Sequence, residues 1–246
     1  PPPPFFSTPT TAYEIGDRLV GSEMCIRDSK KMDLGLNGKN AIITGGSDGI
    51  GLAAAISLSR EGANVAILAR TQEKLDNAVN EIKKDAKGKV VAFSTDVRDE
   101  TSVISSINKV QDEFGKIDIL VNNAGTSSAS PLEEMTNDQL TEDLNLKVYG
   151  AIYCARAVIE DMKSSGSGSI INITTPGGKA TAGGSQPTSL SRAAGISLTK
   201  AWSKEYAASN IRVNTVCVGL LKSGQHRTRV ENIQKEKPDY TLSLIH

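Results

Sequence analysis

The stretch Ala41-Ile42-Ile43-Thr44-Gly45-Gly46-Ser47-Asp48-Gly49-Ile50-Gly51 joins a short apolar run to a glycine-rich turn and then to an amphipathic segment. This order is typical of the first strand, turn and helix of a dinucleotide-binding unit. Glycine has no Cβ, so the backbone can turn tightly and approach a pyrophosphate, which the positive N-terminus of a helix favours. We therefore predict a phosphate-binding turn here; the alternative is a glycine turn that holds no ligand.

Outward from this turn, short apolar runs alternate with segments of helical periodicity. The apolar runs predict six strands, at residues 41–44, 64–69, 90–93, 117–121, 169–173 and 211–217. The amphipathic segments predict helices over residues 50–61, 72–85, 100–114, 137–163 and 189–208. Apolar strands separated by helices indicate a parallel sheet that is covered on both faces. With right-handed crossovers, the fold class is α/β, a doubly wound Rossmann-like sheet in a three-layer αβα sandwich.

The end of the second predicted strand bears on the choice of nucleotide. Its residues are Leu68-Ala69-Arg70-Thr71, with no carboxylate at the tip. An acidic residue there would bind a ribose 2′-hydroxyl, whereas an arginine accommodates a 2′-phosphate. Arg70 therefore favours NADP(H), with NAD(H) as the second choice, unless its side chain simply points to solvent.

Composition argues against several classes of protein. The 246 residues carry 28 Lys and Arg against 28 Asp and Glu, so the formal net charge is zero. Without a basic run, a nucleic-acid or membrane-surface partner is not expected, and no apolar run reaches the roughly 18 residues of a membrane span. Cys25, Cys154 and Cys217 have no metal-ligand spacing. We expect a cytoplasmic protein with no metal site.

Composition also divides the chain. Residues 1–32 show no periodicity and are predicted to be a disordered or foreign N-terminal tail. Residues 33–240 are predicted to form a single domain, and residues 241–246 a second tail.

These motifs together resemble the short-chain dehydrogenase/reductase family over roughly residues 35–224. The first turn matches its TGxxxGIG motif, Asp96-Val97 its adenine-flanking pair, and Asn122-Asn123-Ala124-Gly125 its NNAG motif. Arg212-Val213-Asn214, Gly219 and Ser223 match the sixth strand, the turn after it and a residue near the nicotinamide. The resemblance implies NAD(P)(H), chemistry at the carbonyl or hydroxyl carbon of a small molecule, and a homodimer or homotetramer. The cofactor-binding residues it implies are Gly45, Ser47, Asp48, Gly49, Ile50, Gly51, Arg70, Asp96, Val97, Asn123, Ala124, Gly125, Arg192, Gly219 and Ser223.

The catalytic positions depart from the family pattern. The family uses an Asn, a Ser, a Tyr and a Lys, the last two as YxxxK; the resemblance places Lys147, Thr175, Thr188 and Arg192 there. A Thr175 hydroxyl can still donate to a carbonyl, and Arg192 keeps a positive charge. Thr188 is the severe change, because an aliphatic alcohol is a far weaker acid than a tyrosine of pKa ~10. Losing a positioned acid or base typically costs about 10²–10⁴-fold in rate.

Other titratable side chains could substitute for the missing tyrosine. Lys147 is the best candidate, because its position faces the site in the family. We expect the other candidates to be structural or solvent-facing: Tyr149, Tyr153, Lys179, Lys222 and His226. After Gly219 only 27 residues remain, so we expect the domain to lack the family's substrate-covering helices and its last strand.

Three functions stay open at this point. The first is an NADP(H)-dependent oxidoreductase with non-standard acid/base residues. The second is a catalytically impaired, NADP(H)-binding pseudoenzyme that serves as a sensor or scaffold. The third is a structural subunit that keeps only the fold.

Overall fold

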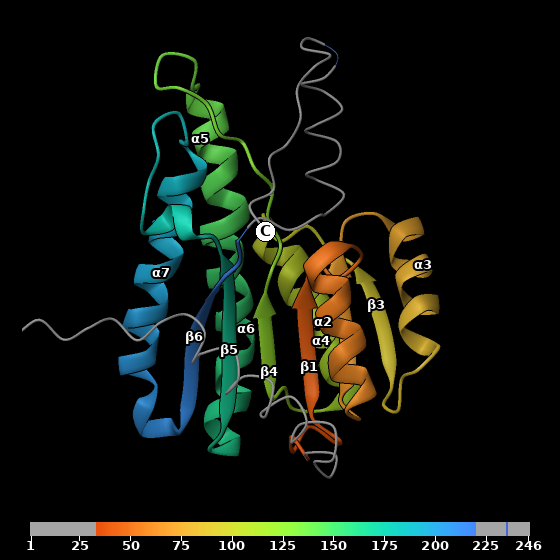
Figure 1. The fold of residues 1–246 in the computed structure, drawn as a ribbon. Coiled ribbons are helices and arrows are strands. Elements are labelled where there is room, and N and C mark those ends of the chain that lie inside the picture. Colours follow the sequence, from red (N-terminus) through yellow and green to blue (C-terminus); the bar gives the residue numbers. More distant parts are fainter. Residues whose placement is uncertain (1–32, 220–234, 236–246) are drawn as a thin grey trace, which may run out of the picture. The chain divides into compact units, whose positions relative to one another are not determined.

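The computed structural model describes residues 33–219 and residue 235 (Figure 1). The chain separates into two compact units, residues 1–35 and residues 36–246, and every helix and strand named below belongs to the second. The predicted tails at 1–32 and 241–246 lie outside the described residues, and the domain boundaries stay predictions.

A six-stranded parallel sheet has the order β3-β2-β1-β4-β5-β6. Ile42 of β1 pairs with Ala66 of β2 on one side and with Leu120 of β4 on the other, so the strand order reverses at β1. This confirms the predicted doubly wound α/β fold, with each strand within two residues of its predicted start. The strands are β1 Asn40–Thr44, β2 Asn64–Ala69, β3 Val90–Ser94, β4 Ile119–Asn122, β5 Gly168–Thr174 and β6 Ile211–Cys217.

Helices cover both faces of the sheet, which gives the predicted three layers (Figure 1). Helices α2 (Gly49–Arg60) and α3 (Gln72–Lys83) pack on one face. Helices α4 (Glu100–Phe114), α6 (Gly150–Ser165) and α7 (Thr188–Glu205) pack on the other. Aspartate side chains cap the N-termini of two of these helices: Asp48 accepts from the backbone of α2, and Asp99 from that of α4.

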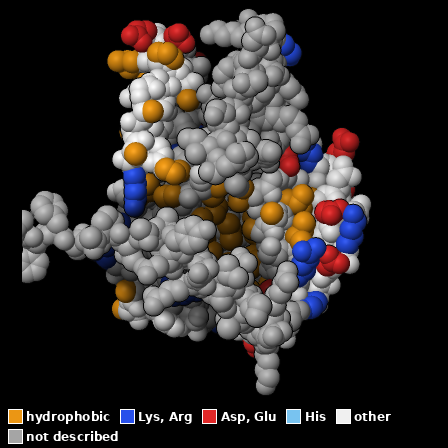
Figure 2. Space-filling model, in the orientation of Figure 1, with side chains coloured by type: hydrophobic (Ala, Val, Ile, Leu, Met, Phe, Trp, Pro, Cys, Tyr) orange, Lys and Arg blue, Asp and Glu red, His pale blue; other side chains and the backbone are white. Residues whose placement is uncertain are grey.

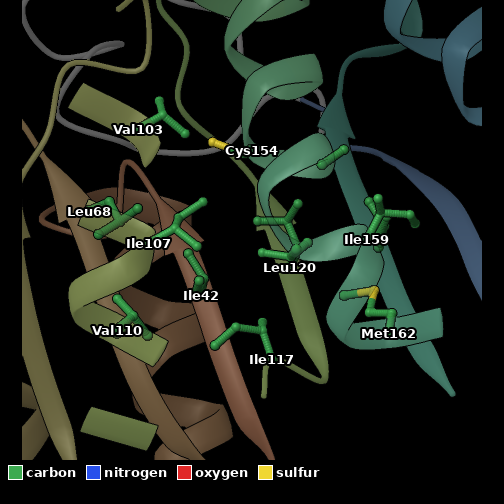
Figure 3. Close-up of a cluster of buried hydrophobic side chains, with 14 of the residues drawn as sticks. Ile42, Leu68, Val103, Ile107, Val110, Ile117, Leu120, Cys154, Ile159 and Met162 are labelled. Atoms are coloured by element: carbon green, nitrogen blue, oxygen red, sulfur yellow. The ribbon is translucent and has the colours of Figure 1, made fainter. Parts of the chain in front are cut away.

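The core consists of two aliphatic layers, one on each face of the sheet. Successive strand residues point to opposite faces, so Ile42 joins the cluster under α4 and α6 while Ile43 joins the one under α2 and α3. Figure 3 shows the first cluster, where Val103, Ile107 and Val110 of α4 face the strands. Both layers are buried at the centre of the sheet, which explains why β1, β2 and β4 appear in the sequence as continuous apolar runs, whereas burial alternates along β5 and β6.

The segment predicted as one helix over 137–163 is divided in the structure. Helix α5 (Asn137–Leu144) leads into a wide π-helical turn, η1 (Asn145–Tyr149), and only then into α6. A π turn holds one more residue than an α turn, and such turns are frequent at functional sites. The apolar pattern runs through it, so periodicity alone could not reveal it. Lys147 lies in this turn.

The turn between β1 and α2 has no room for a side chain on its inner side, whereas its outer side is open at Gly49. Gly49 has a φ of +55°, and a Cβ built on it would have no atom within 4 Å. A Cβ on Gly51 would instead lie 2.3 Å from the Gly45 carbonyl oxygen and 2.5 Å from Asn123 Nδ2. The turn therefore packs tightly against the end of β4 while its outer side remains open.

We predict that Gly51→Ala destabilises the fold, because the added methyl group must displace backbone rather than a flexible side chain. Overpacking of this kind costs about 1–3 kcal/mol. Gly195→Ala in α7 is the matched control, since its Cβ would meet nothing within 4 Å, and a helical glycine replaced by alanine gains up to about 1 kcal/mol. Urea unfolding measures both. Equal stability of the two variants would contradict the close approach.

Candidate functional site

A cleft lies at the carboxyl ends of β1, β2, β4 and β5, where the strand order reverses and the following loops diverge. Two of the predicted cofactor-binding residues do not line it: Gly51, which is packed beneath the turn, and Ser223, which lies outside the described residues. The structure brings the others together around this cleft: Gly45, Ser47, Asp48, Gly49, Ile50, Arg70, Asp96, Val97, Asn123, Ala124, Gly125, Arg192 and Gly219.

Asn123 holds the floor of the cleft in place. Its Nδ2 donates to the carbonyl oxygens of Thr44 and Gly45, at 3.0 and 3.1 Å. Thr44 Oγ1 in turn accepts from the backbone N–H groups of Asn123 and Ala124. The Asn123 side-chain amide therefore joins the β1–α2 turn to the end of β4. These hydrogen bonds are structural, although the sequence predicts that Asn123 binds cofactor.

Positive charge lies beside the end of β2. Arg70 and Lys74 both line the cleft, and both are exposed. Lys74 was missed in the sequence analysis, although it follows Arg70 by four residues across the start of α3. Near α3, Lys, Arg, Asp and Glu side chains are interspersed on the face drawn in Figure 2, so this is a local pair of cations rather than part of a broad basic patch.

Asp96, at the end of β3, is held by a guanidinium. Arg98 donates to both of its carboxylate oxygens, with Nη2 to Oδ2 at 2.6 Å, and reaches Glu142 of α5 with Nη1 at 2.6 Å. The side-chain hydrogen bond from Arg98 lowers the pKa of Asp96, outweighing the effect of partial burial. Asp96 is therefore a fixed carboxylate, and Arg98 ties its loop to α5.

A buried ion pair lies between α5, η1 and α7. Lys147 Nζ donates to Asp143 Oδ1, and the two side chains are 2% and 1% exposed. Ser128 Oγ donates to Asp143 Oδ1 at 2.7 Å and Ser191 Oγ to Oδ2 at 2.5 Å. Burial lowers the pKa of Lys147 and the charge of Arg192 adds to this, whereas Asp143 raises it through a hydrogen bond and its charge.

This network holds the Thr188 hydroxyl in a defined orientation. Thr188 Oγ1 accepts from Lys147 Nζ at 3.3 Å and from the backbone N–H of Ser128 at 3.0 Å. A hydroxyl has two acceptor positions and one proton. Both acceptor positions are used, and within the described residues no hydrogen bond uses the proton.

The other two catalytic candidates border the cleft. Thr175 follows β5 and is half-buried. Arg192, one turn after Thr188 in α7, donates from Nη1 to the Ile173 carbonyl at 2.9 Å and has no carboxylate within ion-pair distance among the described residues. Burial lowers its pKa, opposed by the charge of Asp143. Lys147 and Thr188 do not line the cleft itself, but Lys147 and Arg192 share a smaller pocket behind its wall.

The remaining titratable candidates lie elsewhere or are not described. Tyr149 is 47% exposed and its ring contacts that of Tyr153, while Lys179 is exposed. Lys222 and His226 lie outside the described residues.

Asp143, Ser128 and Ser191 were missed by the sequence analysis. The spacing of Asp143 and Lys147, four residues apart, is a signal for a helical ion pair. Nothing in that spacing indicates burial, and no local pattern links the two serines to it.

Residues 33–219 and 235 contain neither a metal-ligand cluster nor a membrane-spanning helix. No group of three His, Cys, Asp or Glu side chains could hold a metal ion there. No helix in that part of the chain is both long enough and apolar enough to cross a bilayer.

Comparison with known proteins finds many relatives. The model of the short chain dehydrogenase family matches residues 39–234. The 3-oxoacyl-(acyl-carrier-protein) reductase of Thermotoga maritima is 34% identical over 210 residues, covering 85% of this chain and 83% of that protein. The oxidoreductase UcpA of Escherichia coli K12 is 32% identical over 210 residues, covering 85% and 79%.

Solved structures of a reductase and a dehydrogenase are similar to this chain as well. L-sorbose reductase from Gluconobacter frateurii, complexed with NADPH and L-sorbose, has a TM-score of 0.80 at 31% identity, covering 83% of this chain and 78% of that one. NAD+-bound xylitol dehydrogenase has a TM-score of 0.76 at 30% identity, covering 81% and 77%. Both nucleotides occur among the neighbours, so they do not decide between NAD(H) and NADP(H).

We predict that Asp143→Asn is strongly destabilising, because it leaves the Lys147 ammonium buried without a counter-charge. Breaking a buried pair in this way costs about 3–5 kcal/mol. Asp85→Asn is the control: it breaks the exposed pair with Arg60, where a loss below about 1 kcal/mol is expected. Guanidinium unfolding at pH 7 measures both, and similar small losses would contradict the buried pair.

Proposed function

This chain belongs to the short-chain dehydrogenase family, and on that premise we propose that it is an NADP(H)-dependent oxidoreductase. It interconverts a carbonyl and a hydroxyl group on a small-molecule substrate, using non-standard acid/base residues. The observation that carries the proposal is the cleft at the carboxyl ends of the strands, with Gly49 open above the start of α2.

The turn is suited to a diphosphate. Gly49 begins α2, whose first N–H groups have no acceptor inside the helix; that of Gly49 donates to Asp48 Oδ1 at 2.7 Å, and the following ones are left for an anion. Those groups and the helix dipole favour an anion. Gly45, Ser47 and Ile50 line the cleft around them, and Asn123 holds the turn in position.

The cations support NADP(H) over NAD(H). Arg70 would pair its guanidinium with a 2′-phosphate, and Lys74 would add a second charge. On the adenine side we assign Asp96 and Val97, and on the nicotinamide side Ala124, Gly125, Gly219 and Ser223. Arg192 takes the ribose, because its buried guanidinium borders the cleft and lacks a carboxylate partner among the described residues.

The bound nicotinamide would supply or accept the hydride, so the protein must move a proton. We assign this to the Thr188 hydroxyl, whose proton is not otherwise used within the described residues; because Thr188 does not line the cleft, the substrate oxygen must reach past the cleft lining to this hydroxyl. In reduction the substrate oxygen takes the Thr188 proton as Thr188 Oγ1 takes one from Lys147 Nζ, which becomes a neutral amine. Burial, which lowers the pKa of Lys147, favours that release. Thr175 donates a hydrogen bond to the substrate oxygen.

The named relatives include reductases, dehydrogenases and oxidoreductases, which does not favour the pseudoenzyme alternative. The cytoplasmic location and the homodimeric or homotetrameric assembly stay predictions from the family.

Arg70→Ala should weaken NADPH binding by about 10–100-fold, since hydrogen bonds to charged groups contribute about 1.5–3 kcal/mol. The affinity for NADH, which lacks the 2′-phosphate, should fall by less than about threefold. Isothermal titration calorimetry measures both, with Lys109→Ala, an exposed site on α4, as the charge control. Equal losses for the two nucleotides would remove the case for NADP(H).

Thr188→Val should lower the rate of NADPH-dependent ketone reduction by about 10²–10⁴-fold, with NADPH affinity unchanged. Thr188→Ser should recover most of the rate, because the hydroxyl returns.

In the unmodified protein kcat should fall as pH rises through the pKa of Lys147, because the proton donor is then lost. A panel of ketones, monitored by NADPH absorbance, measures these rates. No turnover by the unmodified protein with NADPH bound would overturn the catalytic assignment.

A further inference from the structure

Three buried polar atoms have no hydrogen-bond partner among the described residues: Asn122 Oδ1, Thr174 Oγ1 and Arg192 Nε. Buried polar atoms are nearly always paired, so each such exception calls for a physical explanation. These three atoms come from β4, β5 and α7, which are distant in sequence. Their residues nevertheless line one and the same pocket.

This inner pocket lies behind the wall of the cleft. Its volume is about 30 Å³. The residues that it shares with the cleft, and that separate the two spaces, are Val97, Ala124, Leu146, Ile173, Thr174 and Arg192. Lys147 also lines the inner pocket but not the cleft.

The orientation of the Asn122 amide is determined by a row of hydrogen bonds. Thr199 Oγ1 donates to the Gly195 carbonyl at 2.9 Å and accepts from Asn172 Nδ2 at 2.8 Å. Asn172 therefore presents its Oδ1 to Asn122 Nδ2, at 2.9 Å. The other amide atom of Asn122, the acceptor Oδ1, is left for the pocket.

The other two atoms add a donor and a hydroxyl. Arg192 uses Nη1 on the Ile173 carbonyl, which leaves Nε–H as a donor. Thr174 is 3% exposed, and its hydroxyl can either donate or accept. Lys147 has three N–H bonds, of which two point to Asp143 and Thr188.

We propose that the inner pocket is a binding site for one ordered water molecule, bonded to Asn122 Oδ1, Arg192 Nε and Thr174 Oγ1. Water offers two donors and two acceptors, so it can donate to Asn122 and accept from Arg192, as no single ion can. An anion would face the amide oxygen of Asn122, and a cation would face Arg192 and Lys147. A buried water needs about 10–15 Å³ and two to four polar partners, and the inner pocket supplies both.

The water joins the ends of β4 and β5 to α7 directly behind the cleft wall. It bonds to the Nε–H that the Arg192 guanidinium leaves unused, so this water is a positioning element for Arg192. This inference concerns the protein without nucleotide and does not rest on the proposed function.

A crystal structure of the full chain without nucleotide, at a resolution that shows ordered water, tests the inference. We expect one density peak within hydrogen-bond distance of all three atoms. Thr174→Val, which keeps the shape but removes the hydroxyl, should lose that peak, and Thr174→Ser should keep it. Direct bonds among the three side chains, a pocket without density, or an anomalous peak after a bromide soak would each overturn it.

A solution measurement covers the case in which the valine variant does not fold. In the unmodified protein, the Arg192 Nε–H should show a nuclear Overhauser effect to a long-lived water. Absence of that effect, with the Arg192 resonance assigned and the proton protected from exchange, would overturn the inference independently of any variant.

Discussion

The close approach of the β1–α2 turn to the end of β4 is the constraint on which this molecule depends. Gly51 packs so tightly under the turn that a Cβ would lie 2.3 Å from the Gly45 oxygen, and Asn123 bonds the turn from the neighbouring strand. This contact occurs where the strand order reverses, at the edge of the sheet where the cleft lies. The outer side of the turn stays open at Gly49, where a Cβ would meet no atom within 4 Å, and that opening is suited to a diphosphate.

The two halves of the site follow different rules. The proposed nucleotide half has glycines, a carboxylate and an asparagine at the positions that the sequence motifs predict. The catalytic half has a buried lysine–aspartate pair instead, and three donors converge on Asp143. A buried pair of this kind is held by satisfied hydrogen bonds more than by charge attraction, because desolvation offsets much of the attraction. Fixing Thr188 Oγ1 between Lys147 and Ser128 gives a weak acid one defined direction.

Local patterns were enough for the fold, because the central strands are covered on both faces and are continuous apolar runs, as in Ala41–Thr44. They also located the glycine turn and Arg70. They could not show the π turn at 145–149, since its apolar spacing continues through it. Asp143, Ser128 and Ser191 meet only through tertiary packing. The inner pocket likewise depends on three elements whose side chains carry no shared sequence signal.

A crystal structure with NADPH decides whether the glycine turn takes a diphosphate and whether Arg70 holds the 2′-phosphate. We expect diphosphate oxygens within hydrogen-bond distance of backbone N–H groups at the start of α2. The 2′-phosphate should lie beside Arg70 and the ribose beside Arg192. A nucleotide bound away from this turn, or a turn closed by its neighbours with NADPH present, would contradict this proposal.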